Sequence, residues 1–234
     1  MTLEEVPGYR LAITGQYDGH YGALSPDAAR LRARALDPFA RRVLAALDLP
    51  DDGWHLELGC GDGWLALAIA QARPQMQVVG VDGSEKAIAL ARELAAGARN
   101  AVFHVGSAEA PPEARYARMC ATSVFNLLPD KAAALAAWRH VAARDARLVI
   151  ADGFATRGPG TLGAGAASFD AFVLAARRAG WSVAHREDLT PLVRSLHAAR
   201  VWPWPEYVRD RCRYGLVALR AEGPRGPGPL PMRT

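Results

Sequence analysis

A strand that ends in an acid and runs straight into three alternating glycines constrains this chain more than any other feature. Residues 55–63 read His-Leu-Glu-Leu-Gly-Cys-Gly-Asp-Gly. Glycines at this spacing after a strand permit a tight turn in which the backbone approaches a ligand closely. The spacing Gly61-x-Gly63-x-x-Ala66 also satisfies the pattern of dinucleotide sites. The glycines therefore predict a nucleotide-like ligand without selecting which one.

Glu57 distinguishes between the cofactors that such a loop can bind. Its carboxylate ends a strand that we expect to be buried, where an unpaired charge is costly unless a cation lies against it. The ammonium group of S-adenosyl-L-methionine supplies that cation, whereas a carboxylate would repel the pyrophosphate of a nicotinamide dinucleotide. Asp82 ends the next apolar strand, about twenty residues beyond the loop, where a carboxylate can accept both ribose hydroxyls of either cofactor. Glu57 therefore favours S-adenosylmethionine.

Strand-like runs alternate with helical periodicity through most of the chain. Strands are expected at Trp54–Leu58, Gln77–Val81, Ala101–Val105, Arg118–Thr122, Leu148–Ala151, Trp181–His185 and Tyr214–Ala221. Helices are expected near Asp62–Arg73, Ser84–Ala96, Asp130–Ala143 and Ser168–Ala179, and again after the cap Thr190-Pro191. This alternation implies an α/β fold with a mostly parallel sheet between helices, and ligands outside the carboxyl ends of the strands.

The ends of the chain differ from this alternating region. Ser25-Pro26 and Asp37-Pro38 each set a capping side chain before a proline, as at the start of a helix. The two helices that follow should lay one apolar stripe on the domain, formed by Leu31, Ala35, Phe39, Val43 and Leu47. We predict a lid and helix segment at 1–37, a cofactor domain at 38–221, and a tail at 222–234 whose proline and glycine favour disorder.

Composition excludes several classes of protein. An apolar fraction of 50% and a charged fraction of 22% are typical of globular domains, and no apolar run approaches the roughly 20 residues of a membrane span. Cys60, Cys120 and Cys212 lack the spacing of a metal or redox site. The net charge of +4 comes almost entirely from scattered arginines, which argues against a nucleic-acid partner. We expect a cytoplasmic protein with no membrane span and no bound metal, and leave its oligomeric state open.

The pairing of the glycine loop with the acid after the second strand resembles motifs one and two of the class I, Rossmann-like S-adenosylmethionine-dependent methyltransferases. The residues concerned are Glu57-x-Gly59-x-Gly61-x-Gly63 and Val81-Asp82, and the resemblance extends over Pro38 to Ala221. It implies a three-layer sandwich around a seven-stranded, mainly parallel sheet whose last strand is antiparallel. It also implies transfer of a methyl group from S-adenosylmethionine to a small-molecule acceptor.

The resemblance assigns cofactor contacts residue by residue. The methionine part would be held by the first motif, the ribose by Asp82, and the adenine would lie between residues that follow the third strand. The implied set is Glu57, Gly59, Cys60, Gly61, Gly63, Asp82, Gly83, Ser107 and Ala108, with Tyr21 facing the sulfonium through a cation–π contact. Two positions depart from the family pattern: Ser107 replaces an acid, and Arg144-Asp145-Ala146 stands where relatives carry Pro-Gly-Gly before the fifth strand.

The segment after the fourth strand indicates a subgroup. Residues 123–131 read Ser-Val-Phe-Asn-Leu-Leu-Pro-Asp-Lys and are similar to the arsenite methyltransferases and their quinone C-methyltransferase relatives. Ser123, however, stands where an arsenic-binding cysteine is expected, and a metalloid of that kind prefers several thiolates. We therefore predict a small-molecule methyltransferase of this pattern, with a role in secondary metabolism, that uses neither metal nor metalloid.

Catalytic groups are harder to assign than cofactor contacts. His20 lies in an aromatic segment, Gln16–Gly22, where relatives fold a lid, and its side chain titrates near working pH. Asp152 ends the fifth strand and is either a catalytic acid or a solvated loop residue. Asp62 is expected either to touch the cofactor or to cap the following helix, with the cap favoured, and Cys60 is expected to pack. Two other functions stay open: a cyclase or isomerase that does not consume the cofactor, and an NAD-dependent oxidoreductase.

Overall fold

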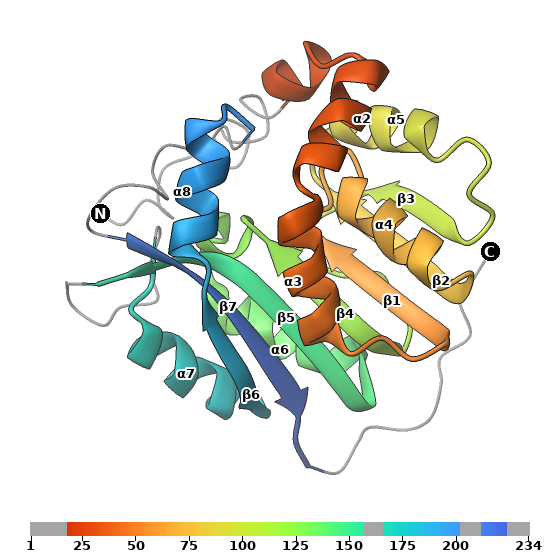
Figure 1. Ribbon diagram of the computed structural model, residues 1–234. Coiled ribbons are helices and arrows are strands. Elements are labelled where there is room, and N and C mark those ends of the chain that lie inside the picture. The colour runs from red at the N-terminus through yellow and green to blue at the C-terminus, as the bar shows by residue number, and fades with distance from the viewer. Residues whose placement is uncertain (1–17, 157–165, 202–211, 224–234) are drawn as a thin grey trace.

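The computed structural model describes residues 18–156, 166–201 and 212–223, and its centre is one seven-stranded sheet (Figure 1). The strands lie in the order β3-β2-β1-β4-β5-β7-β6, and β7 runs antiparallel to both of its neighbours. Their bounds are β1 Asp52–Leu58, β2 Gln75–Asp82, β3 Ala101–Val105, β4 Tyr116–Thr122, β5 Ala142–Ala155, β6 Trp181–Asp188 and β7 Cys212–Ala221. The predicted seven-stranded sheet with an antiparallel last strand is confirmed.

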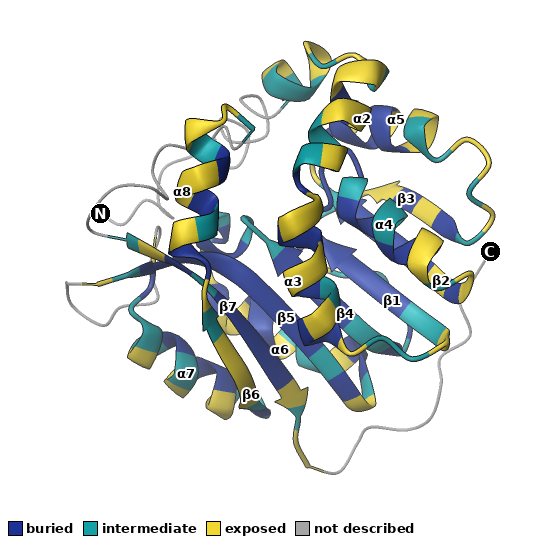
Figure 2. Ribbon diagram, in the orientation of Figure 1, coloured by how far each residue is buried: buried dark blue, intermediate teal, exposed yellow. Residues whose placement is uncertain are grey.

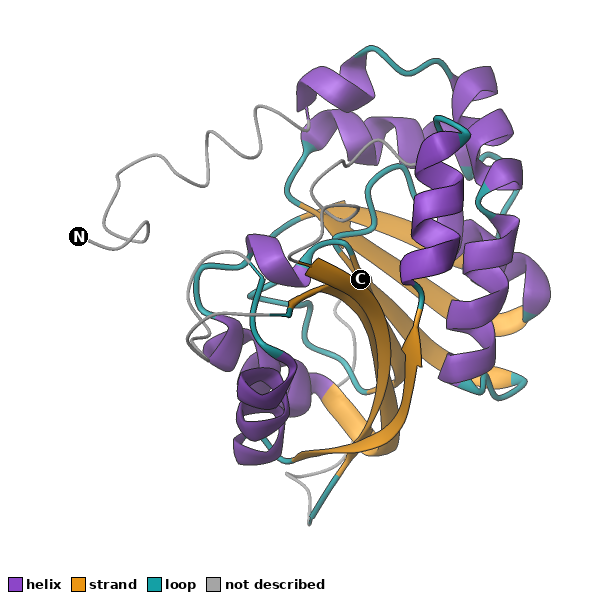
Figure 3. Cartoon of the chain, turned by 60° about the vertical axis from the view of Figure 1, so that its left-hand side comes forward, coloured by secondary structure: helices purple, strands orange, loops and turns teal. Residues whose placement is uncertain are grey.

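Helices cover both faces of the sheet, which makes a three-layer sandwich (Figure 3). One face is covered by α3 Asp37–Leu47, α4 Trp64–Ala72, α5 Glu85–Leu94 and α8 Thr190–Ala198. The other is covered by α6 Lys131–Val141 and α7 Phe169–Arg178. The helix α2, Pro26–Ala35, and a helical turn at residues 18–22 stand beside α4 and α5 (Figure 1).

The central strands are buried on both faces, as a parallel sheet between two helical layers requires (Figure 2). Successive side chains on β1 and β5 enter opposite layers: Val149 packs with α3 and α8, whereas Leu148 and Ile150 pack with α6 and α7. The edge strand β3 instead leaves Val102 and Val105 about half exposed. The carboxyl ends of β1 and β4 lie side by side at the point where the strand order changes direction. That point is where ligands bind in folds of this kind.

The N-terminal helices match the sequence only in part. Ser25 caps α2 as expected, but the N-cap of α3 is Leu36, and Asp37 instead binds Arg41 within the first helical turns. The single apolar stripe is wrong, because the chain turns at Leu36 between two helices. Phe39, Val43 and Leu47 are buried, while Leu31 is 69% exposed.

Three element boundaries also differ. Strand β5 begins at Ala142, directly after α6, so Arg144-Asp145-Ala146 is part of the strand. A register shift between Tyr116 and Arg118 of β4 accommodates these extra residues. Strand β6 extends to Asp188, and Thr190 is not the cap of α8: its hydroxyl accepts a hydrogen bond from the Tyr214 N–H.

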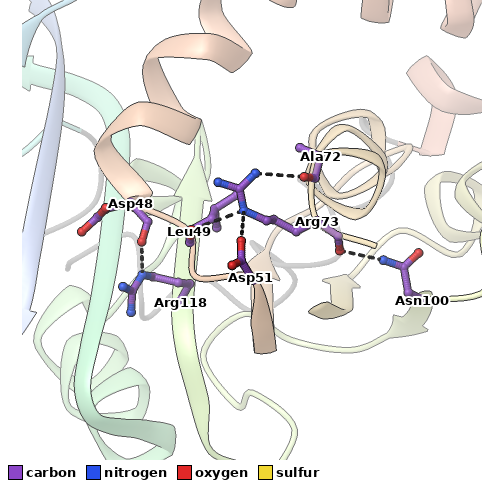
Figure 4. A network of polar contacts seen from close by, with 7 residues as sticks. All are labelled: Asp48, Leu49, Asp51, Ala72, Arg73, Asn100 and Arg118. Atoms are coloured by element: carbon purple, nitrogen blue, oxygen red, sulfur yellow. Dashed lines mark hydrogen bonds and ion pairs between the residues drawn. The ribbon is translucent and has the colours of Figure 1, made fainter. Parts of the chain in front are cut away.

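Arginines close the amino-terminal edge of the sheet by binding main-chain carbonyls (Figure 4). Arg118 donates to Asp48 O at 2.9 Å, and Arg73 donates to Leu49 O at 3.3 Å. Asn100 adds a bond to Arg73 O at 3.2 Å. These contacts tie the ends of α3 and α4 to strands on either side of β1, at the edge opposite the glycine loop. Arg73 and Arg118 therefore stabilise helix ends.

No helix within the described ranges is long and apolar enough to cross a membrane. Some predictions concern other residues: the glycine-rich stretch 158–165, the first residues of the predicted lid, and all but Glu222 and Gly223 of the tail lie outside the described part of the chain. The domain boundaries at 37 and 221 stay a prediction.

Candidate functional site

The glycine loop after β1 has the backbone conformation that only glycine adopts readily. Gly59 and Gly63 have φ values of 70° and 73°, in the left-handed region. A Cβ at Gly59 would come within 2.5 Å of Val124, and one at Gly63 within 2.5 Å of Phe103. The N–H groups of Gly59 and Cys60 both donate to Val81 O, at 2.8 and 3.0 Å. The loop is therefore fixed against the end of β2, and Val124 and Phe103 fill the space that side chains at Gly59 and Gly63 would need.

Glu57 lies at the base of this loop with a carboxylate oxygen that has no partner. The side chain is 1% exposed, and its Oε2 atom is buried without a hydrogen bond. Burial raises the pKa of this carboxyl well above its usual range; the nearby acids Asp62 and Asp82 raise it further, while the Ala66 N–H opposes the shift. An orphaned carboxylate oxygen among further acids is the arrangement that a bound cation stabilises.

Arg32 on α2 belongs to the same site, although no pattern in the sequence indicates it. Its Nη2 lies 2.6 Å from Asp62 Oδ2, and the Asp62 side chain is fully buried. The predicted capping role of Asp62 is wrong: Gly63 is the N-cap of α4 and no side chain caps it. Two buried atoms of the ion pair, Arg32 Nε and Asp62 Oδ1, have no hydrogen-bond partner.

These orphaned atoms fit the amino-acid end of S-adenosylmethionine. A zwitterion needs at least one acceptor for its ammonium and one donor for its carboxylate. Glu57 Oε2 and Asp62 Oδ1 supply acceptors, and Arg32 Nε supplies a donor, all of them buried. The residues present therefore match the group that the glycine loop predicts.

Asp82 stands where a ribose would be recognised. Its Oδ2 accepts from the Gly61 N–H at 2.8 Å and its Oδ1 from the Ser84 N–H at 2.9 Å. Burial raises the pKa of Asp82, and these two N–H groups oppose the shift. Gly83, also predicted as a contact, is exposed beside it. The carboxylate thus joins the glycine loop to the start of α5.

Residues 18–22, the described part of the predicted lid, contact this same region. The Tyr21 hydroxyl lies 2.3 Å from where a Cβ on Gly61 would stand, so only glycine leaves it room. Asp18 accepts a short hydrogen bond from the Ser84 hydroxyl. His20 is half-buried; burial lowers its pKa, and so does the Arg32 guanidinium, against an opposing effect of Asp62. His20 and Tyr21 therefore lie over the cofactor side of the site.

The remaining predicted cofactor contacts lie around the loop. The Ser107 hydroxyl accepts from the Glu109 N–H at 3.2 Å, and Ala108 is buried, with its carbonyl bound by the Trp138 indole N–H at 2.7 Å. Cys60 is 2% exposed, and burial, with Glu57 next in effect, raises the pKa of its thiol well above the usual range. The expectation that Cys60 packs is confirmed. No group of three metal-ligating side chains occurs among the described residues.

Asp152 is neither solvated nor in a loop. It lies within β5 and is fully buried. Its Oδ1 accepts from Asn126 Nδ2 at 2.8 Å and from the Gly153 N–H at 2.7 Å, and its Oδ2 accepts from the Asn126 N–H at 3.1 Å. The buried Lys131 donates to Leu128 O at 2.9 Å. Together these contacts fix the 3₁₀ turn η2, Phe125–Leu127, beside β5. The solvated alternative for Asp152 is wrong.

Ser123 ends the same edge of the sheet, directly after β4. It has a φ of 56°, uncommon for a residue with a side chain. Its N–H donates to Ala151 O at 2.9 Å, and its hydroxyl lies 2.7 Å from the Tyr214 hydroxyl. Its neighbour Val124 contacts the glycine loop at Gly59. Sequence reasoning singled out Ser123 but missed Tyr214, which comes from the distant strand β7.

Family comparison assigns this site to a known class. The model of a family described as a methyltransferase domain matches residues 51–174, more than half of the chain. The chain belongs to that family, and the resemblance drawn from Glu57 to Asp82 is confirmed. A search of curated proteins finds no match.

Solved structures with the same fold include one cyclase and two methyltransferases. The 4+2 cyclase SpnF superimposes with a TM-score of 0.66 at 18% identity over 80% of each chain. Geranyl diphosphate C-methyltransferase from Streptomyces coelicolor, solved with Mg²⁺, geranyl diphosphate and S-adenosyl-L-homocysteine, gives 0.68 at 15% identity over 79% of each chain. The O-methyltransferase of a trans-AT PKS multienzyme of Brevibacillus brevis, solved with S-adenosyl-L-homocysteine, gives 0.59 at 16% identity over 73% of this chain and 67% of that one. At these identities the likeness confirms the fold.

Proposed function

We propose that this protein transfers a methyl group from S-adenosylmethionine to a small-molecule acceptor. One observation carries the proposal: the buried Glu57 carboxylate, with an unpartnered oxygen, stands at the base of a glycine loop lined by two further acids. A site of this charge attracts the cationic cofactor and repels phosphate. Membership of the methyltransferase family supports the same cofactor.

Each end of the cofactor has residues to hold it. Glu57 would bind the ammonium and Arg32 the carboxylate, because their buried free atoms have the required acceptor and donor character. Asp82 would bind the ribose hydroxyls, while Ser107 and Ala108 would flank the adenine. When bound, S-adenosylmethionine supplies an electrophilic methyl group on a sulfonium centre. We also propose that the chain is nearest in pattern to the arsenite and quinone C-methyltransferases of the family, without a metalloid as its substrate.

The chain itself acts chiefly by positioning the two reactants. Fixing them at contact distance removes much of the entropic barrier to an in-line displacement. The turn at residues 18–22 lies over the glycine loop through Tyr21. It would exclude water from the loop, and the Tyr21 ring would face the sulfonium. His20 is neutral at neutral pH because its pKa is lowered, and it can take a proton from the acceptor. Asp152 fixes η2 through Asn126 and so positions the acceptor loop.

The acceptor that we propose is a secondary metabolite. One structural neighbour is a geranyl diphosphate C-methyltransferase, and another belongs to a PKS multienzyme. Many arginines here bind main-chain carbonyls at helix ends, which argues against a nucleic-acid footprint. Three cysteines without a disulfide among them fit a cytoplasmic enzyme.

Titration calorimetry tests the cofactor assignment. We expect S-adenosylmethionine to bind and NAD and NADP not to bind. Glu57→Gln should weaken S-adenosylmethionine by about 10- to 150-fold, the effect of one charge-assisted contact. Glu93→Gln, on the exposed face of α5, is the matched control and should bind normally. Binding of NAD, or equal affinity of the Glu57→Gln variant, would show that the cofactor assignment is wrong.

Methyl-labelled cofactor tests the reaction. Aromatic and polyketide-like acceptors should give labelled product together with an equal amount of S-adenosylhomocysteine. Conversion of an acceptor to an isomer while the cofactor stays intact would support the cyclase or isomerase function instead. This second function is kept because SpnF, a cyclase, shares the fold.

A further inference from the structure

A chain of hydrogen bonds at the end of β4 has only one possible polarity. The Tyr214 hydroxyl lies 2.7 Å from Ala151 O and 2.7 Å from the Ser123 hydroxyl. A carbonyl oxygen can only accept, and a phenol has one proton, so Tyr214 donates to Ala151. The Ser123 hydroxyl must then donate its own proton to Tyr214. Ser123 is left with lone pairs and no hydrogen to offer in any other direction.

This polarity is stable over the ordinary pH range. Tyr214 is fully buried, and burial raises the pKa of its phenol well above the usual range, with Asp152 next in effect. The phenol therefore keeps its proton and continues to donate to Ala151. Reversal would require an ionised tyrosine in an apolar setting, packed 6.0 Å from the Phe39 ring.

Ser123 is placed where an acceptor molecule would lie. It follows β4, next to the glycine loop that its neighbour Val124 contacts. Unlike Tyr214, it is only partly buried. Its φ of 56° is unfavourable for a residue with a side chain. Such conformations persist where surrounding contacts hold them, and here the Ser123 N–H and hydroxyl are both bound.

We propose that Ser123 is a specificity-determining residue that accepts a hydrogen bond from an O–H or N–H group of the methyl acceptor. The proposal rests on the function proposed above and narrows it, because Ser123 can bind a donor but cannot bind an ether or ester oxygen. The substrate class is thus alcohols, phenols or amines that carry an O–H or N–H donor, and not ethers or esters. Ser123 positions the donor group and takes no proton from it. The same property disfavours rebinding of an O-methylated product, which has no hydrogen left to donate.

Paired fragments test this proposal without knowledge of the natural acceptor. The probes are phenol with anisole, 1-naphthol with 1-methoxynaphthalene, and indole with N-methylindole. Each is titrated by NMR against the full chain saturated with S-adenosylhomocysteine. In at least one pair we expect the donor member to bind about tenfold more tightly than its methylated partner. Ser123→Ala should reduce this ratio to near one.

Tyr214→Phe gives a result that a purely structural role would not. It frees the Ser123 proton, so Ser123 can then donate, and the methylated probes should bind more tightly than they do to the unaltered protein. Ala151 O keeps the Ser123 N–H as a donor, so the backbone remains satisfied. Ser123→Gly is a second variant without the hydroxyl, and its backbone suits a φ of 56°.

Three results would overturn the proposal: no donor preference in any pair, a preference unchanged in both Ser123 variants, or equal weakening of both members of a pair by Tyr214→Phe. Every variant is first checked for its melting temperature and for S-adenosylhomocysteine affinity, which should match the unaltered protein. Failure of the proposed function would show differently, as loss of cofactor binding or methyl transfer in the unaltered protein. The two conclusions can therefore fail separately.

Discussion

The glycine loop after β1 and the loop after β4 meet at one edge of the sheet but are built differently. Backbone conformation shapes the first loop: left-handed glycines let Val124, Tyr21 and Phe103 pack closely against the main chain, and buried polar atoms nearby have no hydrogen-bond partner. Side-chain hydrogen bonds shape the second, where Asn126 binds Asp152 and Ser123 binds Tyr214. The cofactor side thus contains buried polar atoms without a hydrogen-bond partner. On the acceptor side, the polar side chains bind one another.

The comparison teaches where each kind of specificity is encoded. A loop defined by backbone conformation depends on residues close together in sequence, and it suits a ligand that does not vary, such as the cofactor. A loop defined by side chains depends on partners from β5 and β7, and single substitutions can alter it. The predictions that follow test this division.

Backbone control should appear most strongly at Gly63. Gly63→Ala adds a Cβ within 2.5 Å of Phe103 at a φ of 73°, so we expect a loss of roughly 2–5 kcal/mol in the free energy of unfolding, measured with denaturant. Gly97→Ala is the control, because Gly97 also has a positive φ but has nothing within 4 Å of its added Cβ. Equal losses in the two variants would mean that the loop is not tightly packed.

The side-chain network should be separable from cofactor binding. Asn126→Ala removes two side-chain hydrogen bonds, one to Oδ1 of the buried Asp152 carboxylate and one to Gly153 O, and should lower the free energy of unfolding by about 1–3 kcal/mol. Its affinity for S-adenosylhomocysteine should stay within about twofold of the unaltered protein, since Glu57 and Asp82 are untouched. A large loss of cofactor affinity would contradict the division into two sides.

The buried Glu57 carboxyl, with an oxygen that has no hydrogen-bond partner, should make the free energy of unfolding depend on pH. Because its folded pKa is raised above 4.5, Glu57 contributes stability that is fully present below that pH and is lost as pH rises through the folded pKa. The ligand-free protein should therefore lose up to about 1.4 kcal/mol per pH unit in this window. S-adenosylhomocysteine should reduce the loss, and its affinity should increase with pH.

Thermal unfolding at a series of pH values, with and without S-adenosylhomocysteine, measures this effect. Glu57→Gln should flatten the ligand-free profile. The pKa of Asp82 is raised as well, so Asp82→Asn identifies the share that belongs to that residue. An unchanged slope in the Glu57→Gln variant would assign the pH dependence to other groups.

The smallest effect is expected at Tyr21. Tyr21→Phe removes the hydroxyl that lies over Gly61 and should weaken S-adenosylhomocysteine by about two- to tenfold, the contribution of one neutral hydrogen bond. Cleavage by protease near Tyr21 should also be slower when S-adenosylhomocysteine is bound. Equal cleavage rates with and without it would rule out closure of this segment over the cofactor.

The contrast between the two loops also explains which features the sequence predicted. Glu57, the glycines and Asp82 lie within one βαβ unit, so their spacing alone indicates a cofactor site. Arg32 was missed because its partner Asp62 is thirty positions away and no local pattern links α2 to the loop. Tyr214 was missed for the same reason, because it is 91 residues away from its partner Ser123. Asp152 was misplaced because a carboxylate at a strand end is usually solvated, and only the fold shows that η2 covers it.

The position of β7 sets an order of assembly. This strand follows all the other described strands in the chain, yet it lies between β5 and β6. During synthesis on the ribosome, the facing edges of β5 and β6 therefore stay open until β7 emerges, and open edges promote aggregation. A chain that stops before Cys212 would carry both edges permanently. Translation that ends early should thus yield insoluble protein and not a partly active enzyme, so carboxyl-terminal truncation is a poor way to map the acceptor site.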